Sequence, residues 1–215
     1  MESINQTMDI IIIAGFIGSG KTTLAKGLVE AACKMSKKAV IISNESGEEK
    51  ISPGFLEKNE CKLIEISSGC ICCKLIESFQ NALNDITREL PDLLIIEPAG
   101  SCQVRDIVAI LERTYVDKFL KINVVTVVDA NDCVDFLDNM GSFYSEQIKE
   151  AGCICLTHTQ SCNEEELLDV QIRIKEINST AKSVIYQKDE HDLQEIKSAL
   201  QDYDKHKHIR MRYRR

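Results

Sequence analysis

The amino-acid sequence predicts a doubly wound α/β fold whose sheet is mostly parallel. Short apolar runs alternate along the chain with segments of helical periodicity, and strands that alternate with helices are joined by right-handed crossovers. The first apolar run ends in a glycine-rich turn that leads into a helix. The 215 residues are enough for one domain with a sizeable core.

The expected strands are short apolar runs. The run at 9–14 is continuously apolar, as in a strand that is buried on both faces. The most β-branched run, at 122–128, is expected near the centre of the sheet. The remaining strands are expected at 39–42, 62–66, 92–97, 154–156 and 183–186.

The expected helices carry apolar residues at spacings of three and four. The first spans 21–35, and the second spans 75–90, where Pro91 ends it. Asn163 is expected to cap a helix whose first turn holds three glutamates, which the helix dipole favours. Leu167, Val170, Ile174 and Ile177 form the buried face of that helix, and further helices are expected at 104–111 and in a last segment that ends near Leu200.

The composition favours a cytoplasmic protein with reduced thiols. A net charge of -8 makes general nucleic-acid binding a poor candidate, because such binding depends on neutralising phosphates. No segment approaches the roughly 20 apolar residues of a membrane span, and the chain does not start like a signal peptide. We therefore expect neither a membrane partner nor a specific nucleic acid. The ten cysteines then indicate metal binding or redox chemistry rather than disulfides.

Residues 15–22 read Gly-Phe-Ile-Gly-Ser-Gly-Lys-Thr and match the phosphate-loop pattern G-x-x-x-x-G-K-[ST]. The motif follows an expected strand and opens a helix, which is the context that supports it. In such loops backbone N–H groups surround phosphate oxygens, the lysine reaches the β- and γ-phosphates, and the threonine hydroxyl binds Mg²⁺. The residues expected at the nucleotide are Gly15, Gly18, Ser19, Gly20, Lys21, Thr22 and Thr23.

Glu97 ends the expected strand at 92–97 and is followed by Pro-Ala-Gly. A carboxylate beside the phosphate-loop strand can act on the Mg²⁺ sphere or on the attacking water. We therefore expect Lys21 and Glu97 to be catalytic, and Thr22 and Glu97 to lie at Mg²⁺. Gly100 would let a backbone N–H approach the γ-phosphate.

A cluster of thiols, Cys70, Cys72 and Cys73, precedes the helix expected at 75–90. Three soft ligands within four residues suit Zn²⁺, Co²⁺ or Cu⁺, and the start of a helix favours thiolates. Coincidental packing in a cysteine-rich chain is the alternative. Cys153 and Cys155 are expected in the core, whereas Cys102 is left open as an accessory ligand.

Together these motifs resemble the CobW-like GTPases, which are relatives of the nickel-insertion GTPases HypB and UreG. The resemblance covers about residues 8–188 and is limited to the N-terminal GTPase domain of that family. It rests on the phosphate loop, Asn-Glu-Ser-Gly-Glu at 44–48, the cysteine cluster, Glu-Pro-Ala-Gly at 97–100 and Val-Val-Asp-Ala at 127–130. The resemblance implies that nucleotide state is coupled to metal at Cys70, Cys72 and Cys73. Glu45 is either a further metal or Mg²⁺-sphere ligand or a solvated loop acid.

The chain departs from the family pattern in three places. The guanine-reading Asn-Lys-x-Asp motif falls at 157–160, which read Thr-His-Thr-Gln. We expect Thr157, His158 and Gln160 to contact the base, and the uncharged amide of Gln160 suits adenine at least as well as guanine. Ser52 is found where the first switch usually carries an acid, which favours slow hydrolysis. The family usually carries a further C-terminal domain, so we expect target recognition to come from another chain or from the basic tail.

The expected function is a nucleoside triphosphatase that uses GTP or ATP with Mg²⁺ and turns over slowly, at about 10⁻⁴ to 10⁻² per second. It would couple the nucleotide to delivery of a thiophilic metal, Zn²⁺ or Co²⁺ first, or to activation of a client metalloenzyme or a corrinoid or other metal-centre protein. A homodimer is a further partner that the resemblance implies. We expect a nucleotide-binding domain at 1–202 and a basic tail at 203–215.

Two alternatives stay open. A small-molecule kinase would also use a phosphate loop, but only Arg88, Arg105 and Arg113 are available in mid-chain for an arginine-rich lid. A sensing module that binds metal or nucleotide without hydrolysis is the second alternative.

Overall fold

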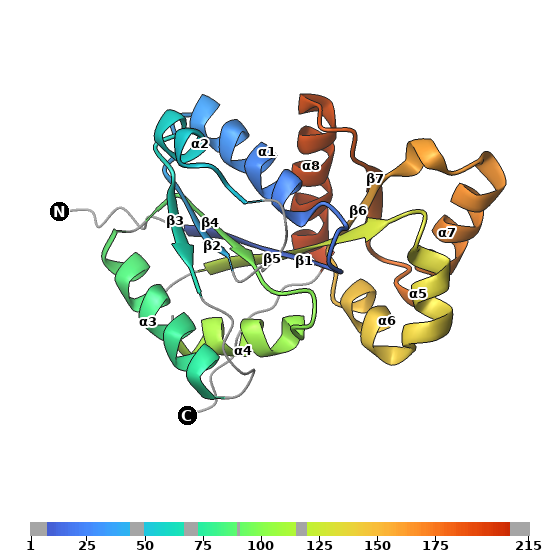
Figure 1. Ribbon diagram of the computed structural model, residues 1–215, viewed down its shortest axis with the longest axis horizontal. Coiled ribbons are helices and arrows are strands. Elements are labelled where there is room, and N and C mark those ends of the chain that lie inside the picture. The colour runs from blue at the N-terminus through green and yellow to red at the C-terminus, as the bar shows by residue number, and fades with distance from the viewer. Residues whose placement is uncertain (1–7, 44–49, 67–72, 90, 115–119, 207–215) are drawn as a thin grey trace.

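The computed structural model describes residues 8–43, 50–66, 73–89, 91–114 and 120–206 (Figure 1). Within these residues seven strands form one parallel sheet in the order β3-β2-β4-β1-β5-β6-β7. The strands are β1 (Met8–Gly15), β2 (Ala39–Ser43), β3 (Lys62–Glu65), β4 (Leu93–Glu97), β5 (Leu120–Asp129), β6 (Cys153–Thr157) and β7 (Lys182–Ile185). The doubly wound, parallel α/β fold is therefore confirmed, and β1 lies at the middle of the sheet between β4 and β5.

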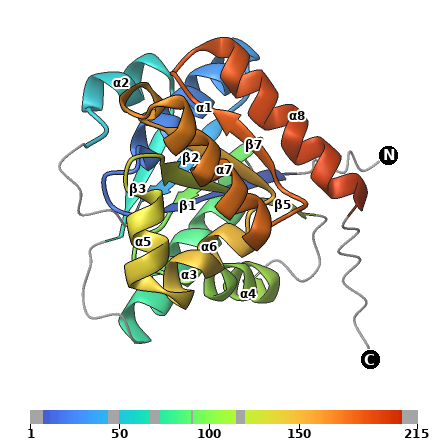
Figure 2. The ribbon, with the colours of Figure 1, turned by 90° about the vertical axis from the view of Figure 1, so that its right-hand side faces the viewer.

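Helices cover both faces of this sheet (Figures 1 and 2). One face carries α1, α2 and α8, and the other carries α3 and α4 at one end and α5, α6 and α7 at the other. Their bounds are α1 (Lys21–Lys34), α2 (Pro53–Lys58), α3 (Cys73–Glu89), α4 (Val104–Thr114), α5 (Cys133–Met140), α6 (Ser142–Lys149), α7 (Glu164–Ile177) and α8 (Glu190–His206). A single 3-10 turn, η1 (Thr159–Ser161), follows β6.

The core divides along the central strand because successive side chains of a strand point to opposite faces. Ile11 and Ile13 pack under α1 and α8, whereas Ile10 and Ile12 pack under α3 and α4. These four isoleucine side chains are almost completely buried. This burial explains the continuous apolar run in the sequence.

Three helices were not predicted from the sequence. In α2 the side chain of Ser52 accepts a hydrogen bond from the N–H of Phe55 and Pro53 follows at the first helical position, so Ser52 is a helix cap. Helices α5 and α6 have eight residues each and meet at Gly141, where φ is 57°. Two turns are too few to establish a periodic pattern. The last helix was expected to end near residue 200, but α8 continues to His206.

The cap at Asn163 agrees with the prediction. Its side chain accepts from the N–H of Glu166 at 2.9 Å, and the Glu166 carboxylate accepts from the N–H of Asn163 at 2.9 Å. This reciprocal pair is a capping box. Among the described helices none has the length and apolar character that crossing a membrane requires.

Candidate functional site

The candidate site lies at the carboxyl edge of the sheet, where β1 turns into α1. Three glycines of this turn adopt positive φ angles, +141° at Gly15, +82° at Gly18 and +98° at Gly20. A Cβ at Gly15 would approach the carbonyl oxygen of Val127 to 2.4 Å, so this position excludes any side chain. The turn has the conformation that a phosphate-binding loop requires, and it opens helix α1 as expected.

Two polar side chains of the loop are turned inward. Lys21 is only 3% exposed, and its Nζ donates to the carbonyl oxygen of Phe16 at 2.8 Å, so the ammonium lies over its own loop. The hydroxyl of Ser19 is buried and has no hydrogen-bond partner among the described residues. Buried polar atoms are normally paired, so an orphaned hydroxyl inside the loop fits a ligand that supplies the partner.

Thr22 and Glu97 face each other where two neighbouring strands end. The Thr22 hydroxyl donates to Oε1 of Glu97 at 2.5 Å, and both residues are buried. They come together because β4, which ends at Glu97, pairs directly with β1. Hydroxyl and carboxylate oxygens are the hard ligands that Mg²⁺ takes from proteins, so the pair fits the ion.

Gly100 brings the loop after β4 against the phosphate loop. A Cβ at Gly100 would lie 3.0 Å from the backbone nitrogen of Ile17 and 3.3 Å from the carbonyl oxygen of Gly15. Such contacts are tighter than a side chain normally permits. The close approach of the two loops therefore depends on glycine at this position.

The residues expected to contact the base follow β6, which lies two strands from β1 in the sheet. Thr157, His158 and Gln160 line a hollow of about 390 Å³ together with Gly20 and Thr23 of the phosphate-loop segment. The structure thus brings these five residues together.

Two of the expected base-contacting residues have structural partners of their own. The Thr157 hydroxyl lies 2.8 Å from the carbonyl oxygen of Ser19 and 3.3 Å from that of Val128. His158 adopts φ 54°, and its Nδ1 lies 2.7 Å from Oδ2 of Asp129. Gln160 is exposed at the rim of the hollow and keeps its amide available for a base.

The sequence prediction missed part of the lining of the hollow. Tyr186, Gln187 and Lys188, which follow β7, also line it. The parallel sheet places the carboxyl ends of β6 and β7 at the same edge, so the end of the strand expected at 183–186 carried a usable signal.

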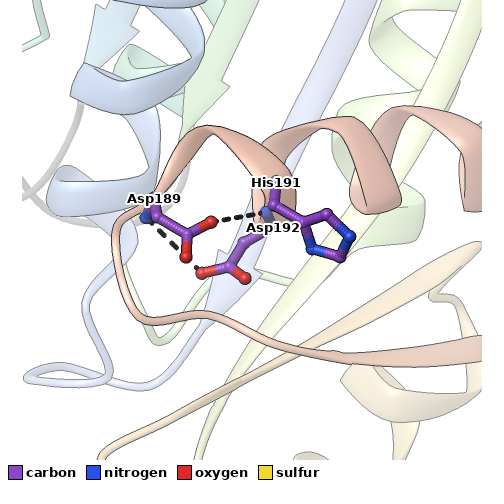
Figure 3. A group of neighbouring side chains, drawn as sticks. All are labelled: Asp189, His191 and Asp192. Carbon is purple, nitrogen blue, oxygen red and sulfur yellow. Dashed lines mark hydrogen bonds between the residues drawn. The ribbon is translucent and has the colours of Figure 1, made fainter.

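Asp189, His191 and Asp192 form a group of possible metal ligands at the start of α8, the one such group that the described residues contain (Figure 3). Both carboxylates have backbone partners. Asp189 accepts from the N–H of Asp192 at 2.9 Å, while Asp192 accepts from the N–H groups of Gln187 at 2.6 Å and Asp189 at 3.5 Å. These bonds form a helix cap and fix the loop that lines the hollow. The cap accounts for the cluster without a metal.

Two of the three cysteines of the predicted metal cluster, Cys70 and Cys72, lie outside the described residues. Glu45 also lies outside them. Cys73 is the first residue of α3, although its side chain is not described. Helix α3 follows β3, which lies two strands from β4 in the sheet. At about 4.8 Å per strand, the carboxyl end of β3 is on the order of 10 Å from the end of β4 that carries Glu97.

The cysteines of β6 are core residues, as expected. Cys153 and Cys155 are completely buried. Burial raises the pKa of Cys153 to about 12 and also raises that of Cys155. Metal binding needs thiolates, so both are poor ligands. Cys102 is half-buried in an apolar groove of about 340 Å³ that Glu97 and Pro98 also line.

The glycine-rich β1–α1 turn, the inward Lys21 and the Thr22–Glu97 pair define a P-loop nucleotide-binding domain. The sequence profile of the family described as "CobW/HypB/UreG, nucleotide-binding domain" matches residues 9–185. The chain therefore belongs to the CobW/HypB/UreG family.

The chain is also similar in sequence to curated proteins. The chain is 26% identical over 200 residues to the zinc-regulated GTPase metalloprotein activator 1 of Schizosaccharomyces pombe, covering 85% of this chain and 46% of the relative. It is 27% identical over 180 residues to the zinc chaperone YjiA of Escherichia coli, covering 80% and 55%. The chain thus spans about half the length of these relatives.

Solved structures share the fold. The Zn(II)-bound YjiA GTPase from E. coli superimposes with a TM-score of 0.62 at 23% identity, covering 84% of this chain and 57% of that one. The hydrogenase maturation factor HypB from Archaeoglobus fulgidus gives 0.62 at 20% identity, covering 91% and 90%. At these identities the likeness concerns the fold alone.

Proposed function

We propose that the chain is a nucleoside triphosphatase that couples nucleotide binding and slow hydrolysis to the handling of a thiophilic metal for a client metalloprotein. The observation that carries the nucleotide part is the buried Thr22–Glu97 pair beside the phosphate loop. Family membership and the zinc-chaperone relatives support the metal part.

In this proposal the phosphate loop holds the triphosphate. Lys21 leaves the carbonyl of Phe16 to bind the phosphates, and the Ser19 hydroxyl gains the partner that it lacks among the described residues. Thr22 and Glu97 hold Mg²⁺, which neutralises phosphate charge when bound. Glu97 lies deep in the site and is well placed to orient a water, because it reaches this edge from the strand next to β1.

In this proposal the metal is the cargo, and the thiolates of Cys70, Cys72 and Cys73 hold it. The start of α3 at Cys73 supports this assignment, because a helix N-terminus stabilises a thiolate. Zn²⁺ is the first choice because the relatives are zinc chaperones by name, and Co²⁺ is the second. Glu45 is a candidate further ligand in the same proposal.

A client protein and a homodimer belong to the proposal as well. We also propose one nucleotide-binding domain over residues 1–202 and a basic tail over 203–215, whose first residues continue α8. The basic tail is a candidate for client recognition.

The test is purification without chelators, followed by metal analysis and by titration with GTP and ATP, each with and without added Zn²⁺. The expected result is about one thiophilic ion per chain, nucleotide binding that requires Mg²⁺, and phosphate release without any added acceptor. Phosphate transfer only in the presence of a small-molecule acceptor would instead support a kinase. Binding without any phosphate release would support a sensing module.

A further inference from the structure

Helix α6 contacts the loop that follows β4 and contains Gly100 through one buried side chain. Gln147 is 4% exposed, and its Nε2 donates to the carbonyl oxygen of Gly100 at 3.0 Å. Its main chain is fixed separately, because the Thr126 hydroxyl of β5 donates to the Gln147 carbonyl at 2.7 Å. The side-chain amide can therefore change partners while the helix stays in place.

The other end of this amide is unsatisfied. Oε1 of Gln147 is buried and has no hydrogen-bond partner within the described residues. A buried acceptor without a partner is costly, and native proteins rarely keep one without a reason. Rotation of the terminal amide exchanges its oxygen and nitrogen, so the same side chain can either donate to a carbonyl or accept from an N–H.

The loop that Gln147 holds is the one that lies against the phosphate loop. A Cβ at Gly100 would lie only 3.0 Å from the nitrogen of Ile17 and 3.3 Å from the oxygen of Gly15, so the backbone at Gly100 passes close beside the loop expected to hold the phosphates. In the proposed function, on which this inference rests, only the terminal phosphate of a triphosphate extends as far as Gly100. A diphosphate ends at the phosphate loop itself.

Helix α6 also contacts the phosphate loop directly. The ring of Phe16 lies 5.0 Å from the Tyr144 ring and 5.9 Å from the Phe143 ring, both on α6. The opposite end of the helix is fixed by Asn178, whose Nδ2 donates to the carbonyls of residues 148, 149 and 151. The helix is thus a firm support that touches both loops around the terminal phosphate.

We propose that Gln147 is a positioning residue that sets the Gly100 loop for the terminal phosphate, so that discrimination between triphosphate and diphosphate depends on α6. The carbonyl of Gly100 is held by an amide donor, and this bond fixes the peptide plane between Gly100 and Ser101 and with it the course of the loop beside the phosphate loop. Loss of this donor loosens the loop and weakens binding of the triphosphate alone.

The test compares affinities for GDP and for a non-hydrolysable GTP analogue, each with Mg²⁺, in wild type, Gln147→Met and Gln147→Glu. Methionine keeps the volume and removes the orphaned oxygen, so this variant should fold. Glutamate keeps the shape, but its carboxylate cannot donate to Gly100. Both variants should bind the triphosphate analogue at least fivefold more weakly and change GDP affinity less than twofold.

Glu146→Gln is the matched control on the same helix, because the Glu146 carboxylate lies at the surface, 3.5 Å from Arg105. It should leave both affinities unchanged. The inference would be overturned if the ratio of triphosphate affinity to diphosphate affinity were unchanged in Gln147→Met and Gln147→Glu. An equal loss of affinity for both nucleotides is one such result. Wild-type protein that binds neither nucleotide would instead contradict the proposed function.

Discussion

The Thr157 hydroxyl lies 2.8 Å from the carbonyl oxygen of Ser19, so the segment expected to read the base is tied to the phosphate loop. A second bond, to Val128, ties the same hydroxyl to β5. Thr157 therefore supports the wall of the hollow and has little capacity left for the base. We therefore propose that the exposed amide of Gln160 and the loop at 186–188, which line the same hollow, read the base.

The first prediction concerns the base. An amide offers both a donor and an acceptor, and neither Gln160 nor Gln187 carries the charge that would favour guanine. We expect GTP and ATP affinities within about tenfold of each other, a difference of at most about 1.4 kcal/mol. Gln160→Asp should shift the preference toward GTP. Competition titrations at fixed Mg²⁺ measure both, and a wild-type GTP preference above about a hundredfold would contradict this reading.

The second prediction concerns Lys21. Its ammonium rests on the carbonyl of Phe16 and not on the core, so Lys21→Ala should abolish tight triphosphate binding while the protein remains folded. Lys34→Ala, a surface change in the last turn of the same helix, should bind as wild type. Titration calorimetry measures the nucleotide affinity, and circular dichroism checks that the variants are folded. Wild-type affinity in Lys21→Ala would remove the phosphate-loop assignment.

The third prediction concerns metal. Cys72→Ser or Cys73→Ser should reduce the bound Zn²⁺ strongly, and metal binding to the wild type should release protons because thiolates are required. Cys33→Ser, at a half-buried thiol of α1, should keep the full metal content. Metal analysis after gel filtration provides the measurement. Equal metal content in all three variants would rule out the cysteine cluster.

The fourth prediction concerns alkaline pH. Burial raises the pKa of Cys153 to about 12 and that of Cys133 to about 11, whereas thiols of an unfolded chain titrate near about 8.5. Above that pH the unfolded chain binds fewer protons than the folded one, so the free energy of unfolding should fall between about pH 9 and 12 and be fully retained below. Urea titrations at several pH values measure this fall. It should be shallower in Cys153→Ala, and an identical slope would exclude a contribution from this thiol.

The fifth prediction concerns Asn178. Its amide joins the end of α6 to the turn before β7, since its Oδ1 also accepts from the N–H groups of Thr180 and Ala181. Asn178→Ala should lower the free energy of unfolding by roughly 2–4 kcal/mol, because several buried backbone groups lose their partner. Asn139→Ala, at an exposed asparagine, should cost less than about 0.5 kcal/mol. Chemical denaturation of both variants tests the difference, and equal stabilities would be inconsistent with a connecting role.

The strands and the long helices could be predicted because burial imposes a pattern on many consecutive residues. The continuous apolar run of Ile10 to Ile13 and the spacing along α7 are examples. The α5–α6 hairpin could not be predicted, because two short helices joined at Gly141 repeat no pattern. The position of this hairpin is set by contacts between residues distant in sequence, such as Phe16 and Phe136, whose rings lie 4.9 Å apart.

The candidate site was predicted where it depends on a local motif. The phosphate loop has fixed spacing and a strand–helix context, so Lys21 and Thr22 could be placed from the sequence alone. The Thr22–Glu97 contact needed the further knowledge that β4 pairs with β1. Gln147 had no such signal, because it becomes part of the site only through packing of elements that are far apart in the chain.

The aromatic contacts of the phosphate loop have a practical consequence for optical measurements. The chain has five tyrosines and no tryptophan, so its intrinsic fluorescence comes from tyrosine alone. Tyr144 lies against Phe16 of the phosphate loop, and Tyr186 lines the hollow beside Gln160. A nucleotide entering this site changes the surroundings of two of the five emitting rings, and its arrival can be followed without a label.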